Sequence, residues 1–144
     1  MKKTSKITKE KIEEIKKIPI GYPKLTIEFY FWIGLISALL LRATYLLEPF
    51  NALSAKLAWY VGIGGYMLFF IHRHRVSVRR KNTVKSLGLL EKIKNHEKLD
   101  IVDYNALEYV LWSLSVSKEK LNYVIIIIFS CFAIISALTL EFLL

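Results

Sequence analysis

The residues with the most evident chemistry form a basic cluster in the middle of the chain. Two histidines alternate with two arginines and three more cations follow shortly after, so that the cluster comprises His72, Arg73, His74, Arg75, Arg79, Arg80 and Lys81. Guanidinium and ammonium groups at this density bind phosphate through charge and hydrogen bonds. We expect them to contact anionic lipid headgroups or an acidic partner. An H-x-H pair without a further Cys or His close by does not define a metal site, and we expect neither a metal nor a cofactor.

Three charged residues lie inside otherwise apolar segments. Glu28 and Arg42 lie near the two ends of one segment, and Glu141 lies near the end of another. Ionisable groups in a bilayer are costly, and they are usually paired or functional. We expect Arg42 to pair with Glu141. Glu28 lies at the level of His72, Arg73 and Lys120, and we expect it to pair with a basic residue at the end of the apolar segment that precedes His72. In the alternative, each charge reaches the lipid headgroups by itself.

The basic cluster also leaves an enzymatic interpretation open. Residues 72–75 would bind the phosphate of a lipid substrate, and Glu28 would act as the acid or base. This interpretation requires Glu28 within hydrogen-bond reach of a cavity shared with His72 or His74. The sequence contains no Ser/His/Asp arrangement, no zinc-ligand spacing and no dinucleotide fingerprint. It also lacks a nucleic-acid-binding module and stacking aromatics near the arginines, so nucleic acid is not a favoured partner.

Three long apolar segments carry or flank these residues. They span residues 26–47, 53–71 and 121–144, and hydrophobic residues make up 54% of the chain. A helix over the first segment rises about 33 Å, which is enough to cross the hydrocarbon core of a bilayer. The segments are apolar on all faces rather than along one stripe, as lipid-exposed helices are. We therefore predict an all-α integral membrane protein with three transmembrane helices.

The distribution of Lys and Arg predicts the orientation of these helices. Of the 21 cations, eight lie in residues 1–24 and eleven in residues 72–120, and only Arg42 and Lys56 lie elsewhere. Positively charged loops remain in the cytoplasm, so the N-terminus is expected inside and the C-terminus outside. The net charge of +9 is explained by this asymmetry. Residues 1–24 contain no apolar core of a signal peptide, so the first apolar segment is expected to remain in the protein.

The two polar segments are predicted to form a basic cytoplasmic helical layer. Within residues 1–24, an amphipathic helix with Thr8 as its N-cap ends before Pro19. Residues 72–120 are predicted to form a helical hairpin with a break at residues 95–100. Its first helix follows the three-residue repeat of Val84, Leu87, Leu90 and Ile93. Its second helix is capped by Asp103, can continue into the third span, and has an apolar face made of Tyr104, Leu107, Val110, Leu111 and Leu114. The predicted organisation is therefore 1–24, 25–71, 72–120 and 121–144.

Small residues recur about one helical turn apart in each predicted span. They are Gly34 and Ala38 in the first, Ala58, Gly62 and Gly65 in the second, and Ala133 and Ala137 in the third. Small residues let helices approach closely. We expect packing within the bundle, with an interface between subunits as the alternative. The only cysteine, Cys131, excludes an intramolecular disulfide and is expected to be a small buried hydrophobe.

These patterns favour a non-enzymatic interaction protein. The expected role is that of a small accessory or scaffold subunit, which forms a homo-oligomer or joins a larger membrane complex. Its basic cytoplasmic face would contact anionic lipids or an acidic partner. The alternative is a membrane-embedded enzyme that acts on a phosphate-bearing lipid.

Overall fold

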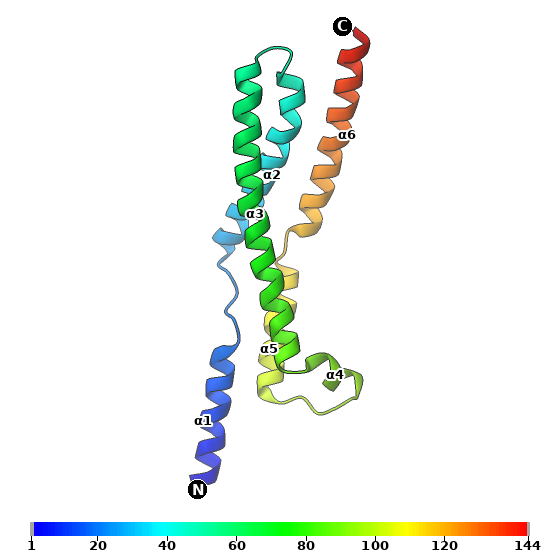
Figure 1. Ribbon diagram of the computed structural model, residues 1–144. Coiled ribbons are helices and arrows are strands. Elements are labelled where there is room, and N and C mark those ends of the chain that lie inside the picture. Colours follow the sequence, from blue (N-terminus) through cyan, green and yellow to red (C-terminus); the bar gives the residue numbers. More distant parts are fainter. Residues whose placement is uncertain (1, 144) are drawn as a thin grey trace. The chain divides into compact units, whose positions relative to one another are not determined.

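A computed structural model describes residues 2–143 of the chain, with side chains from residue 9 onward. Six α-helices make up the secondary structure of this part, which contains no strand (Figure 1). The chain divides into two compact units. We call Met1–Tyr22 with His74–Ser117 the polar unit, and Pro23–Arg73 with Lys118–Leu144 the apolar unit.

The apolar unit contains α2, α6 and the part of α3 up to Arg73, and these helices match the three predicted spans. Helix α2 is Lys24–Leu47, α3 is Ala52–Ser86 and α6 is Glu119–Leu143. Three helical segments of the described chain are long and apolar enough to cross a membrane: Lys24–Leu47, Ala52–Ser86 and a segment within Ile101–Leu143 that includes α6. The prediction of an all-helical chain with three such segments is confirmed.

A tight turn after Leu47 joins α2 to α3 in the apolar unit (Figure 1). The Asn51 side-chain oxygen accepts hydrogen bonds from the amides of Leu53, at 3.0 Å, and Ser54, at 3.3 Å. These amides have no partner within the first turn of α3, so the side chain caps the helix. The cap fixes the point at which the chain reverses between the first two spans.

Most of the apolar surface of the spans faces outward. Helix α2 buries only a narrow stripe, made of Phe31, Gly34, Leu35, Ser37 and Ala38. Among the described residues of α6, Asn122 alone is buried. Side chains such as Trp32, Phe132 and Ile135 are more than half exposed, which is unusual on the surface of a protein dissolved in water. Cys131 is also exposed, so its prediction as a buried residue was wrong.

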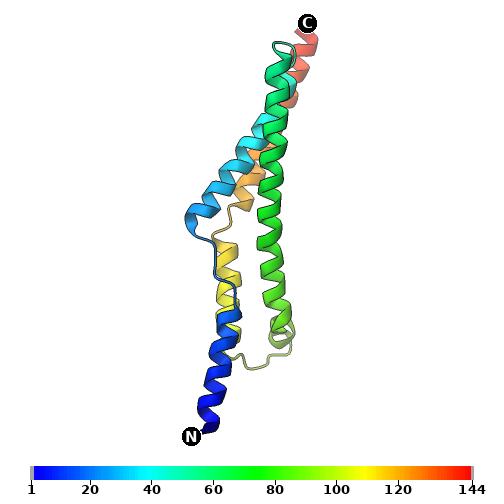
Figure 2. The same ribbon diagram turned by 60° about the vertical axis from the view of Figure 1, so that its left-hand side comes forward.

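Helix α3 extends well beyond the apolar segment that predicted it. The segment ends at residue 71, but the helix continues without a break to Ser86 (Figure 2). Residues 72–86 include six Arg and Lys, which are good helix formers, and no Pro or Gly, so the loss of hydrophobicity does not end the helix. Gly88, with a φ of 58°, then adopts the left-handed conformation that glycine tolerates.

The first predicted helix of the hairpin, through residues 84–93, was wrong because Gly88 interrupts it. This glycine separates α3 from the short helix α4, Leu89–Lys94. The buried residue is Leu89, at 2% exposure, whereas Leu90 and Ile93 of the predicted repeat are exposed. The three-residue repeat did not predict which residue is buried, because it assumes one continuous helix, and the left-handed conformation of Gly88 changes the direction of the chain.

Helix α5, Ile101–Ser115, begins after the predicted break at residues 95–100. Its N-cap is Asp100 rather than Asp103. Asp103 is the third helical residue and completes a capping box, because its carboxylate accepts the Asp100 amide at 3.0 Å. The sequence thus contained both residues of the box, and the prediction assigned the cap to the wrong one.

The buried face of α5 also differs from the predicted one. It consists of Val102, Asp103, Ala106 and Ser113. Of the predicted apolar face, Tyr104, Leu111 and Leu114 are each more than half exposed. The buried polar groups are tolerated because cations of the polar unit bond to them, as described below.

The ends of α5 and α1 correct two further predictions. Helix α5 ends at Ser115 and α6 begins at Glu119, so α5 does not continue into the third span. The Ser117 amide donates to the Leu114 carbonyl at 3.2 Å, which tightens this end of the helix. Helix α1 is Lys2–Lys17, so Thr8 lies inside the helix and is not its N-cap. Good helix formers before Thr8 extend the helix in that direction.

Candidate functional site

The basic cluster lies on the second half of α3, and its members face different sides of the helix. Residues three, four and seven positions apart share a face of a helix, so His74, Lys81 and Lys85 form one row, and Arg75 lies beside this row, about 100° round the helix from His74. His74, Arg75 and Lys81 are exposed, and so is Lys85, one turn beyond Lys81. We call these four residues the outer basic face. Within residues 9–143 their side chains have no hydrogen bond or ion pair. Lys85 was not among the predicted site residues, although its spacing of four from Lys81 was a signal for it.

Arg80 points toward the inside of the polar unit. Its guanidinium donates to the Ser113 hydroxyl at 2.8 Å and to the Ser113 carbonyl at 2.6 Å. Arg79 lies over the ring of Tyr22, with the guanidinium carbon 4.8 Å from the ring centre. Both arginines therefore have internal contacts that reduce their availability to a ligand.

Tyr109 lies on the same side of α5 as these contacts. Burial raises the pKa of its hydroxyl, although the positive charges of Arg79 and Arg80 lower it. The net effect keeps Tyr109 neutral to higher pH than an exposed tyrosine.

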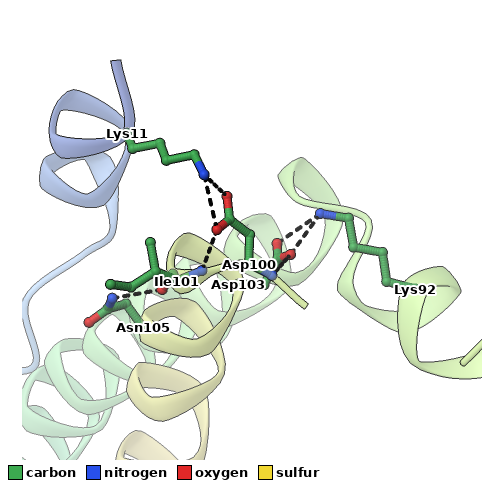
Figure 3. Close-up of polar contacts among 6 residues, drawn as sticks. All are labelled: Lys11, Lys92, Asp100, Ile101, Asp103 and Asn105. Carbon is green, nitrogen blue, oxygen red and sulfur yellow. Dashed lines mark hydrogen bonds and ion pairs between the residues drawn. The ribbon is translucent and has the colours of Figure 1, made fainter. Parts of the chain in front are cut away.

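Acidic residues at the start of α5 attach two other elements of the polar unit (Figure 3). Lys11 of α1 contacts Asp100, with an N–O distance of 2.9 Å. Lys92 of α4 donates to both oxygens of Asp103, at 2.8 and 3.0 Å. The hydrogen bond from Lys11 and the bond from the Ile101 amide lower the pKa of Asp100. The start of α5 thus holds α1 and α4 by ion pairs, of which the one at Asp103 is buried.

Arg73 belongs to the apolar unit, where it joins the end of the second span to the start of the third. Its guanidinium donates to the Glu119 carboxylate and, at 2.9 Å, to the Tyr123 hydroxyl. Its guanidinium carbon also lies 5.6 Å from the centre of the Phe69 ring and 5.3 Å from that of Tyr123. This arginine connects helices rather than presenting its charge outward.

Glu28 forms an ion pair with Lys118, which lies just before α6. The Lys118 ammonium is 3.4 Å from its carboxylate and lies over the ring of Phe31. His72, which we expected near Glu28, stacks on Tyr30 with ring centres 3.9 Å apart and an interplanar angle of 3°. Glu28 therefore pairs with Lys118, which directly precedes α6, whereas Arg73 at the end of the second span bonds to Glu119 and Tyr123.

Arg42 does not pair with Glu141. Its guanidinium donates to the Ser130 hydroxyl, at 2.9 and 2.6 Å, and to the Ala38 carbonyl at 2.8 Å. Glu141 lies eleven residues after Ser130, which corresponds to about 16 Å along a helix. The depth deduced by counting residues from the segment ends was therefore wrong, because α2 and α6 meet at a different register.

The small residues of the first two spans lie where helices approach closely. A β-carbon added to Gly34 would be 2.6 Å from the Phe69 ring, and one added to Gly65 would be 2.1 Å from the Ser37 hydroxyl. Gly62 is similarly close to α2, and Ala38 and Ala58 are buried. Ala133 and Ala137 of α6 are partly exposed. These contacts belong to packing within one chain.

No group of three or more His, Cys, Asp or Glu side chains suited to a metal ion occurs in the described part of the chain. Comparison with known proteins gives no match to a family model, to a curated protein or to a solved structure.

Proposed function

We propose that the chain is a non-enzymatic, multi-pass membrane protein whose polar unit binds anionic lipid at the cytoplasmic surface, as an accessory or scaffold subunit. The observation that carries this proposal is the outer basic face of α3. It follows the second apolar segment on the same helix, and its cations have no internal partners within residues 9–143. Cations immediately beside a span are placed to contact lipid phosphates.

The charge of the two units supports the same proposal. The polar unit contains fifteen Lys and Arg against eight Asp and Glu, and so carries seven of the nine excess positive charges. Positive charge in loops favours the cytoplasmic side, which supports an orientation with the N-terminus inside and the C-terminus outside. Each such cation near an anionic surface contributes about 1 kcal/mol to attraction.

The role of a subunit in an assembly is supported by the exposed apolar face of α5. Tyr104, Leu111 and Leu114 are 60%, 57% and 52% exposed in the polar unit. Apolar faces of this kind usually contact another protein or the membrane interface. The contacts of Glu28 and His72 argue against the enzymatic alternative, because Lys118 and Tyr30 hold the groups that it would use.

The test compares two variants of the full-length protein with equal charge changes. One carries Arg75→Gln, Lys81→Gln and Lys85→Gln on the outer basic face. The matched control carries Lys9→Gln, Lys16→Gln and Lys94→Gln, which also removes three exposed positive charges. Each protein is purified in mild detergent from membranes containing phosphatidylglycerol, and the retained lipid is quantified by mass spectrometry.

We expect the outer-face variant to lose most of its retained anionic lipid and the control to keep it. Equal losses in both variants would mean that diffuse charge, not this face, attracts lipid. No loss in either would contradict lipid binding by the polar unit. Mass spectrometry of the same samples also identifies co-purifying proteins. If a stoichiometric protein is lost only from the outer-face variant, the ligand of this face is an acidic protein partner and not lipid.

A further inference from the structure

A second charged site lies in the apolar unit, at the turn between the first two spans. The end of α2 and the first turns of α3 line an open surface cavity of about 270 Å³. Its lining includes Thr44 and Glu48 on one side and Lys56, Trp59 and Tyr60 on the other.

The cavity contains one anion and one cation that do not neutralise each other. Glu48 and Lys56 are both exposed, and neither has a hydrogen bond from its side chain or an ion pair within residues 9–143. A site with two separate and unpaired charges of opposite sign is complementary to a zwitterion. An anion alone would be repelled by Glu48, and a cation alone by Lys56.

The two charges lie in a definite order along the span. Glu48 is in the turn directly after α2, whereas Lys56 is one helical turn inside α3, about 6 Å from its first residue. In a membrane-inserted chain the cation is therefore attached nearer to the bilayer centre than the anion is. Zwitterionic phospholipids have the matching order, since their phosphate is next to the glycerol and their ammonium is at the outer tip.

The aromatic residues of the cavity fit this location. Trp59 and Tyr60 are 46% and 66% exposed and pack edge to face, with ring centres 5.1 Å apart. Exposed Trp and Tyr collect at the level of lipid headgroups. A carboxylate such as Glu48 accepts hydrogen bonds, which a primary ammonium donates and a quaternary one does not.

We propose that this cavity binds the headgroup of a zwitterionic phospholipid with a primary ammonium, of the phosphatidylethanolamine class. Lys56 binds the phosphate, Glu48 accepts hydrogen bonds from the ammonium, and the aromatic pair flanks the headgroup. The site is distinct from the outer basic face, which takes anionic lipid at the other membrane surface. The inference rests on the proposed membrane insertion.

The experiment titrates the full-length protein in detergent with phosphatidylethanolamine, phosphatidylcholine or phosphatidylglycerol of identical acyl chains. Native mass spectrometry then measures the fraction of protein that carries one lipid. The variants are Glu48→Gln, Lys56→Gln and the exchange of both charges, Glu48→Lys with Lys56→Glu. The exchange keeps the net charge and both charge types but reverses their order in depth.

We expect the wild-type protein to bind phosphatidylethanolamine more tightly than phosphatidylcholine. Each single variant should bind phosphatidylethanolamine about tenfold more weakly than the wild-type protein does, because it loses one charge-assisted hydrogen bond. The exchanged variant should bind as weakly as the single variants. Phosphatidylglycerol binding should not fall in any of the three, because the outer basic face is intact.

Two results would overturn the site. One is equal binding of phosphatidylcholine and phosphatidylethanolamine by the wild-type protein. The other is unchanged phosphatidylethanolamine binding by the exchanged variant. Extraction of the wild-type protein from membranes by alkaline carbonate would instead refute membrane insertion, and with it both the proposed function and this site. If the protein resists extraction but gives either of the first two results, the lipid site alone is refuted and the proposed function stands.

Discussion

Replacing Ser130 by alanine should destabilise the apolar unit more than its small volume suggests. The Ser130 hydroxyl accepts two of the three hydrogen bonds formed by the Arg42 guanidinium, at 2.9 and 2.6 Å. The hydroxyl itself donates to the Ile126 carbonyl at 2.7 Å. Ser130→Ala therefore removes two bonds to a charged group that is partly buried between α2 and α6.

The expected loss in the free energy of unfolding is about 1–2 kcal/mol. Hydrogen bonds between membrane helices contribute about 0.6 kcal/mol on average and at most about 1.7 kcal/mol. Bonds to charged groups are stronger, but Arg42 is only partly buried and water or headgroups can replace some of its contacts. Ser136→Ala in the same helix is the matched control, since the Ser136 hydroxyl has no hydrogen bond within residues 9–143. It should change the free energy by less than about 0.5 kcal/mol.

The assay is equilibrium unfolding in mixed micelles, followed by tryptophan fluorescence and by circular dichroism. Arg42→Met should cost less than Ser130→Ala, because Ser130 keeps its bond to Ile126 and no charge is left without a partner. In the Arg42→Met background, Ser130→Ala should then cost almost nothing. If Ser130→Ala costs the same in both backgrounds, the two residues are not coupled and the assigned contact is wrong.

Three further predictions concern the other contacts. Asp103→Ala should destabilise the protein by about 2–3 kcal/mol in thermal unfolding, because it removes the second carboxylate of the capping box and the partner of Lys92; an effect below about 0.5 kcal/mol would contradict this. Gly34→Ala should cost about 1–3 kcal/mol through a clash with an aromatic ring of α3, whereas Gly64→Ala, with no atom within 4 Å, should be neutral; equal effects would refute the close approach. Because its folded pKa is lowered, Asp100 stabilises the contact with Lys11 at neutral pH and loses this effect as pH falls below 3.8 through the folded pKa. A spin label on α1 should therefore become more mobile in acid, and should already be mobile at neutral pH in Asp100→Asn.

Several features of the polar unit could not be deduced from its apolar residues. The prediction placed the apolar face of α5 inward, but Asp103 and Ser113 are buried and Tyr104 is exposed. The cations that bond to the two buried groups, Lys92 and Arg80, lie 11 and 33 residues away in the chain. Burial of a polar side chain is favourable only when such partners are present, and a helical repeat contains no information about them.

Other features were local and were therefore predictable. The turn at residues 48–51 and the break at residues 95–100 follow from turn-forming residues between helical segments. The end of α1 before Pro19 follows from the restriction that proline places on the preceding residue. The extent of α3 was underestimated because an apolar segment and a helix end for different reasons.

The sequence by itself determined that this chain is helical, that three segments are long and apolar enough to cross a membrane, and that its positive charge is concentrated in two polar segments. These are properties of composition along the chain, and each is independent of any distant contact. Only the tertiary structure decided that Arg42 bonds to Ser130 and that Glu28 forms an ion pair with Lys118. It also decided which residues of the basic cluster have internal contacts and which are exposed. The physical reason is that the partner of a charge depends on how each helix is rotated and shifted against its neighbours. Close packing at small residues sets that rotation and register, and the position of a residue in the sequence does not.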